Sequence, residues 1–89
     1  MAPDVVRVTH HRATTLDLTF ADGTERRINL ADLVRPEGVF SDLYSPGFVA
    51  SATVNADIGT ICWSNGADFS PEVLFTSGLL LKAGSMTAA

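Results

Sequence analysis

Residues 16–30 read LDLTFADGTERRINL, and this stretch decides the fold. Apolar and polar residues alternate strictly from Leu16 to Phe20, which is the period of a strand with one face on a core and the other in water. Asp22-Gly23 follows, and this dipeptide is a strong signal for a tight turn because glycine adopts positive φ without steric penalty. Apolar residues share one face again in residues 24–30. The stretch therefore predicts a β-hairpin.

A further strand is predicted before the hairpin. Residues 5–10 are short and rich in β-branched side chains. By the two-residue period, Val6 and Val8 share one face, and Val5 and Arg7 share the other. We expect residues 5–9 to form an outer strand with unpaired backbone groups, which Arg7 alone protects against pairing with another chain.

After the hairpin, Asn29 is expected to cap a short helical turn that ends before Pro36. Residues 38–46 predict a loop with one possible turn. Several of its apolar members are expected to plug one end of the core: Val39, Phe40, Leu43 and Tyr44. Residues 48–54 and 60–63 predict two more strands.

A short helix is expected from residue 71. Ser70 offers a hydroxyl cap, Pro71 suits the first helical position, and Glu72 complements the positive helix end. The helix should bury residues 73–75 and end near Gly78. The sequence thus predicts one α+β domain over residues 1–83, with a small antiparallel or mixed sheet of about five strands and a short C-terminal helix packed on it. Residues 84–89 are expected to be disordered.

Composition narrows the class of protein. Of the 89 residues, 18% are charged, which is below the usual ~25% and favours burial against a partner or a second copy. The net charge of −4 and only six basic residues disfavour nucleic acid and anionic membranes as partners. The longest apolar run, residues 79–81, is far too short to span a membrane, and no signal peptide is visible. A single cysteine, Cys62, fits a reducing cytoplasm.

No catalytic, cofactor or metal residues are predicted. Adjacent strand residues point to opposite faces, so His10 and His11 cannot chelate one metal together, and a ligand such as Asp57 or Cys62 would have to come from elsewhere. Cys62 sits in a strand, where a free cysteine usually acts as a small apolar residue. The carboxylates have local explanations in turns, caps and solvated faces, and no glycine-rich phosphate loop is present.

The stretch WSNGAD, residues 63–68, carries the most information. In one interpretation it is a connector that pins Trp63 on the core, with Asn65 and Asp68 bonded to nearby backbone and Gly66 in a conformation closed to other residues. In the other it is a recognition loop with an aromatic anchor. Trp63, Asn65, Gly66 and Asp68 are therefore the candidate interaction loop.

Three blocks resemble a bacterial family catalogued as domain of unknown function 2442 (DUF2442). They are LDLTFADGT at 16–24, FSDL at 40–43 with Phe48, and WSNGADFSPE at 63–72, and the likeness runs over about residues 4–75. The chain departs from the family at Ser64, where proline is usual, and at Phe75, where tyrosine is frequent. The resemblance implies a small α+β fold and no established activity. Some members are fused to a helix-turn-helix or encoded beside another small protein, which implies a docking, sensing or antitoxin-like role.

Together these features predict a non-enzymatic protein-interaction module that binds a protein partner or associates with itself. The alternative is a small-ligand sensor or minor enzyme that uses a pocket beside Trp63. A flat apolar patch or an exposed sheet edge would favour the first. A pocket where Asp68 converges with Cys62 or His10 would favour the second.

Overall fold

The predicted hairpin organises the molecule. In the computed structural model, which describes residues 2–84, β2 (Thr15–Phe20) pairs antiparallel with β3 (Glu25–Asn29). At the turn, Gly23 has φ of 90° and its N–H donates to the Phe20 carbonyl over 2.9 Å. The Asp22 carboxylate accepts from the Thr24 N–H, also over 2.9 Å. The hairpin prediction is confirmed.

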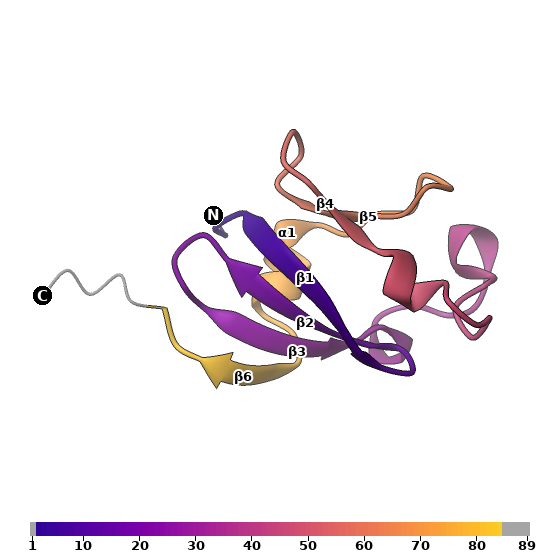
Figure 1. Ribbon diagram of the computed structural model, residues 1–89, viewed down its shortest axis with the longest axis horizontal. Helices are drawn as coiled ribbons and strands as arrows, with labels where there is room; N and C mark the ends of the chain where they lie inside the picture. Colours follow the sequence, from indigo (N-terminus) through magenta and orange to yellow (C-terminus); the bar gives the residue numbers. More distant parts are fainter. Residues whose placement is uncertain (1, 85–89) are drawn as a thin grey trace, which may run out of the picture.

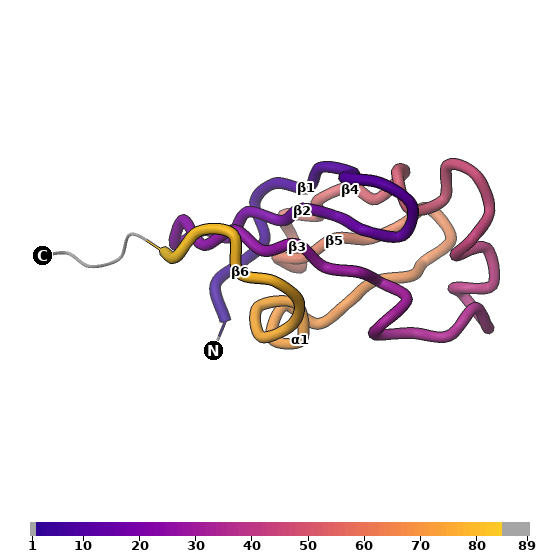
Figure 2. The backbone as a smooth tube through the Cα atoms, turned by 90° about the horizontal axis from the view of Figure 1, so that it is seen from below, coloured from indigo at the N-terminus to yellow at the C-terminus, as the bar shows by residue number. Residues whose placement is uncertain are grey.

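Two antiparallel sheets make up most of the fold (Figure 1). The larger has the order β1-β2-β3-β6, with β1 (Val5–Arg12) and β6 (Leu79–Lys82) at its edges. The smaller is the hairpin β4 (Thr53–Asn55) and β5 (Thr60–Cys62). The helix α1 (Pro71–Phe75) lies below the sheets when they are seen from the side (Figure 2). The predicted α+β class with antiparallel strands is confirmed, although strands dominate.

Two details of the predicted architecture differ. The described part of the chain, residues 2–84, has six strands in two sheets rather than about five in one. The helix is also followed by a strand, β6, because Gly78 (φ 72°) turns the chain back beside β3. Within residues 2–84, no helix is long and apolar enough to cross a membrane.

The faces of β1 were predicted wrongly. Val5 lies opposite Phe20 and Val8 opposite Leu18, so both share the core-facing side of the sheet. An irregularity between Val5 and Arg7 inserts one extra residue, which leaves Val6 exposed. A bulge of this kind shifts the two-residue period by one, so strict alternation along the strand fails.

The core fills the space between the sheets, the loops and α1. Its most deeply buried large side chains are Val5, Leu16, Leu18, Phe20, Ile28, Leu30, Leu43, Ile61 and Leu74. Helix α1 has only five residues, so a single position, Leu74, is fully buried while Val73 faces solvent, contrary to prediction. Phe75 packs edge-on against Phe20, with ring centroids 5.0 Å apart.

Three short 3-10 helices join the strands: η1 (Leu30–Asp32), η2 (Gly38–Phe40) and η3 (Val49–Ser51). Asn29 caps η1 as predicted, since its side chain accepts the Ala31 N–H. Ser70 occupies the cap position of α1, but its hydroxyl donates to the Glu72 carboxylate rather than accepting a backbone N–H.

The strand predicted over residues 48–54 is mostly η3, and only its end belongs to β4. The hydroxyl of Ser51 donates to the Phe48 carbonyl over 2.6 Å, a local bond that competes with strand pairing. In the preceding loop Leu43 plugs the core as predicted, but Tyr44 and Val39 are exposed. Apart from Gly84, the predicted tail lies outside the described residues.

Candidate functional site

The candidate loop begins with a buried anchor. Trp63 lies at the end of β5, and its Nε1 donates to the Phe48 carbonyl over 3.0 Å. Its ring stacks on the ring of Phe48 and meets the edges of Phe40 and Phe69. Because the indole is enclosed and its only donor is satisfied, Trp63 is a core residue and offers no anchor to a partner.

In the rest of the loop, Asn65 is held by hydrogen bonds, whereas the side chain of Asp68 faces solvent. Asn65 binds in two directions: its Nδ2 donates to the Val39 carbonyl over 2.7 Å, and its Oδ1 accepts the Ala67 N–H over 3.0 Å. Gly66 has φ of 92°, as the connector interpretation requires. Asp68 is exposed, and no hydrogen bond to its side chain is recorded within residues 2–84. The connector interpretation therefore applies to Asn65, whereas within residues 2–84 Asp68 contributes its backbone alone, in a bridge with Cys62.

Of the other chemically reactive residues, Cys62 lies beside this loop in a backbone bridge with Asp68, whereas both histidines lie on β1. The Sγ atom of Cys62 lies 3.9 Å from the Thr53 hydroxyl and is half-buried. His10 lies opposite Leu16 near the end of β1, while His11 falls in a second irregularity of that strand. In the part of the chain that the structure describes, no three side chains of the metal-binding types come together.

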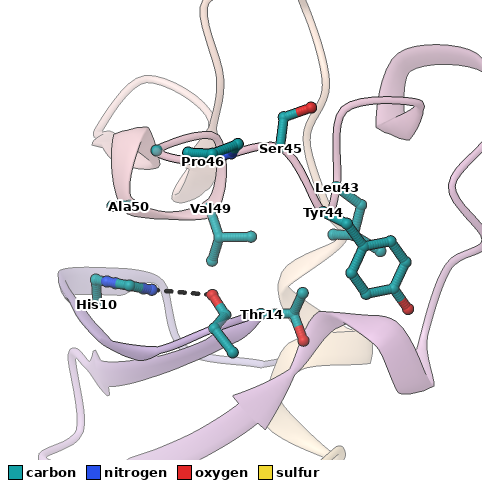
Figure 3. Close-up of a pocket in the computed structure, with 10 residues that line it drawn as sticks. His10, Thr14, Leu43, Tyr44, Ser45, Pro46, Val49 and Ala50 are labelled. Carbon is teal, nitrogen blue, oxygen red and sulfur yellow. Dashed lines mark hydrogen bonds between the residues drawn. The ribbon is translucent and has the colours of Figure 1, made fainter.

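One pocket opens elsewhere, between the turn that joins β1 to β2 and the segment 43–50 (Figure 3). Its volume is about 250 Å³. Val49 and Leu43 contribute buried apolar surface, and His10 and Tyr44 stand at the exposed rim. Trp63, Cys62 and Asp68 do not line this pocket.

The most exposed apolar element is an edge strand. All four residues of β6 are exposed, and Leu79, Leu80 and Leu81 keep 59%, 48% and 39% of their surface in solvent. On one side β6 pairs with β3; on the other, no strand among residues 2–84 joins it. Sequence reasoning missed this surface, because the run 79–81 was considered only as a membrane segment. The signal available in the sequence was the apolar run 79–81 directly after a turn residue, Gly78, because an edge strand can produce this pattern.

The opposite edge, β1, is an outer strand as predicted, but it is better protected. Its first residue is bonded to a neighbouring loop, since the Val5 N–H donates to the Gly59 carbonyl over 2.9 Å. Two register shifts bend the strand, and Arg7, His11 and Arg12 place charge or polarity along it. Bulges and charged side chains are the usual devices that discourage edge pairing.

An ion pair lies on the solvent face of the large sheet. Arg27 donates through Nε and Nη2 to both carboxylate oxygens of Asp17, over 2.8 and 2.9 Å. The bonds from Arg27 hold the pKa of Asp17 below its usual value, against the opposing effect of burial. This pair fixes the central strands side by side.

These features define a small, mainly β domain of the α+β class with an exposed apolar sheet edge and an open pocket. The chain belongs to the family described as protein of unknown function (DUF2442), whose model matches residues 5–78. The match confirms the resemblance and ends just before β6. No curated protein and no solved structure matches the chain.

Proposed function

We propose that the chain is a non-enzymatic protein-interaction module that binds its partner by strand addition at β6. The observation that supports this is the open edge of the large sheet, lined by Leu79, Leu80 and Leu81. In strand addition an extended segment pairs its backbone with such an edge, and alternate side chains give specificity.

The backbone of β6 makes the edge suitable for this role. Each strand residue carries one N–H and one C=O, and in a two-sided sheet roughly half of them point to each neighbour. β3 occupies one side of β6 only. An incoming strand would form hydrogen bonds with the outward-facing N–H and C=O groups of β6 and would remove the leucines from water. Both changes favour binding.

The strand also indicates what kind of partner fits. Its four residues span about 13 Å. Two strands of this length, paired edge to edge, would bury far less surface than the ~1,600 Å² of a standard interface. A longer extended segment that continues past β6 would bury more. Lys82 is the only charge on the strand, so an apolar segment with an acidic residue near that end suits the edge.

The rival class, a minor enzyme, has less support. The pocket is lined by His10 but by neither Cys62 nor Asp68, so the three groups do not converge on one cavity. A nucleophile needs a base within hydrogen-bond reach. Within residues 2–84, the Cys62 thiol has one hydrogen-bond neighbour, the Thr53 hydroxyl, which is not a base.

The proposal is tested by capture from an extract of the source cell with the full chain immobilised. Three forms are compared: wild type, Leu79→Glu and, as control, Val39→Glu. Leu79 lies opposite Arg27, so the new carboxylate is tolerated while it places charge on the edge. Val39 is also an exposed apolar residue, at 49%, but lies on η2. We expect a partner that wild type and Val39→Glu retain and Leu79→Glu loses.

Light scattering on the same three proteins separates a second copy from a different partner. A doubled mass for wild type that Leu79→Glu abolishes would identify the second copy as the partner. Capture of the same proteins by all three forms, with a monomeric mass throughout, would contradict the proposal. The identity of the captured protein would show which role applies: docking, sensing or antitoxin-like regulation.

A further inference from the structure

The pocket between the β1–β2 turn and the segment 43–50 is independent of the β6 edge. We propose that this pocket binds one small aromatic group, of one ring or two fused rings, that carries a polar substituent at its open mouth. The inference goes beyond the interaction role proposed above, and it rests on the shape, the lining and the fixed rim of the pocket (Figure 3).

The lining favours an apolar ring. Val49 points into the space between His10 and Thr14, and Leu43 supplies further buried apolar surface (Figure 3). The Thr14 hydroxyl donates its hydrogen to Asn29 over 2.6 Å, so toward the pocket it can only accept. Removing a ring from water onto these groups is favourable, whereas a charged group would lose its hydration without a buried partner.

The size sets the class of ligand. The volume of about 250 Å³ exceeds the ~150 Å³ of an apolar cavity that holds benzene, and lies below the ~300–1,000 Å³ typical of sites for larger ligands. One ring, or two fused rings, therefore fits. A nucleotide or a flavin does not.

Two rings, those of His10 and Tyr44, stand at the rim of the pocket, and a hydrogen bond holds the ring of His10. His10 Nε2 lies 2.9 Å from the Ala13 carbonyl, which can only accept, so Nε2 carries the hydrogen and the imidazole is held in place. Tyr44 stands on another side of the mouth with 66% of its surface exposed. Aromatic rings at 4.5–7 Å stack or meet edge-on favourably, so an incoming ring gains contacts from both.

The polar side chains of the lining are His10, Thr14, Tyr44 and Ser45. Tyr44 and Ser45 are exposed, and within residues 2–84 neither hydroxyl makes a hydrogen bond. A hydroxyl or ring N–H on the ligand can pair with them while the ring body is enclosed. This arrangement selects a phenol-like or indole-like ligand over a plain hydrocarbon.

The experiment is a titration of the whole ¹⁵N-labelled chain with indole, followed by NMR. We expect saturable shifts at the amides of Ala13, Thr14, Gly47 and Ala50, with a Kd on the order of 1 mM for so small a probe. Tyr44→Ala removes an exposed wall and should weaken binding by roughly five-fold or more. Ile58→Ala, which changes an exposed apolar residue outside the pocket, should bind as wild type does.

A parallel titration with N-acetyl-tryptophanamide separates two sources of the ring. Binding at least as tight as indole would assign the ring to a side chain of a protein partner. Binding of indole alone would assign it to a free small molecule. Either result supports the pocket. Shifts that fail to saturate, that fall outside the pocket, or that are identical in Tyr44→Ala would overturn the proposal.

Discussion

The indole of Trp63 lies flat on the ring of Phe48, with centroids 5.5 Å apart and planes 4° from parallel, and its Nε1 donates to the carbonyl of that same residue. Phe48 precedes η3, and Trp63 follows β5. One pair of residues therefore joins the loop that carries the pocket to the end of the small sheet, through both a side-chain stack and a backbone bond.

Truncating this anchor should unfold much of the population. Trp63→Ala removes the stack, two edge contacts and the bond to Phe48, and we expect the free energy of unfolding to fall by about 3–5 kcal/mol. A domain of this size has only about that much stability. Urea denaturation followed by circular dichroism measures the loss, with exposed Tyr44→Ala as the control. A folded Trp63→Ala protein with wild-type stability would contradict the core assignment.

The two polar residues of the loop should behave differently. Asn65→Ala deletes both bonds, to Val39 and to Ala67, and should lower the free energy of unfolding by about 1–2 kcal/mol. Asp68→Ala removes an exposed carboxylate and should change it by less than about 0.5 kcal/mol. Melting temperatures of the two variants, measured in the same buffer, decide the matter. Equal losses would mean that Asp68 has a structural partner after all.

The part of the fold that could be predicted is the part set by local chemistry. Alternation in β2 and the Asp22-Gly23 turn specify the hairpin within a few residues, and Pro71 marks the helix start. The faces of β1 could not be predicted, because a bulge depends on how two strands pair and not on either strand alone. The same holds for η3, where side-chain bonds to nearby backbone override a weak strand preference.

The site was harder to predict than the fold. Burial of Trp63 and the role of Asn65 follow from residue type, and both predictions are confirmed. The pocket brings His10 next to Val49, two residues far apart in sequence, so its existence depends on the tertiary arrangement. For β6, three consecutive leucines suggest burial, but among residues 2–84 this sheet edge has no further strand beside it, and the leucines stay in solvent.

Two turn residues give predictions of opposite sign. Gly23 has φ of 90°, where a β-branched side chain is strained, so Gly23→Val should lower the free energy of unfolding by about 1–2 kcal/mol. Ala13 has φ of 47° despite its Cβ, so Ala13→Gly should raise it by about 0.5–1 kcal/mol. Urea midpoints of the two variants provide the measurement. If Ala13→Gly lost stability instead, the positive φ of Ala13 would not be a source of strain in the wild-type protein.

The ion pair between Asp17 and Arg27 should make stability depend on acid. The bonds from Arg27 hold the folded-state pKa of Asp17 below its ordinary value of 3.8. The unfolded chain therefore takes up the proton first as pH falls. The contribution of the pair is fully present above 3.8 and is lost as pH drops through the lower, folded-state pKa. Both side chains remain partly exposed, so screening by solvent keeps this contribution small.

Replacing the guanidinium separates this effect from general acid denaturation. In Arg27→Met, Asp17 should titrate at a higher pH than in wild type, because the two bonds that favour its charged form are gone. The stability difference between the two proteins should shrink below pH 3.8 as wild-type Asp17 also becomes protonated. Carboxyl ¹³C shifts recorded against pH give the titration directly, and exposed Arg35→Met is the matched control. If Asp17 titrates at the same pH in all three proteins, the pair does not persist in solution and contributes nothing to the fold.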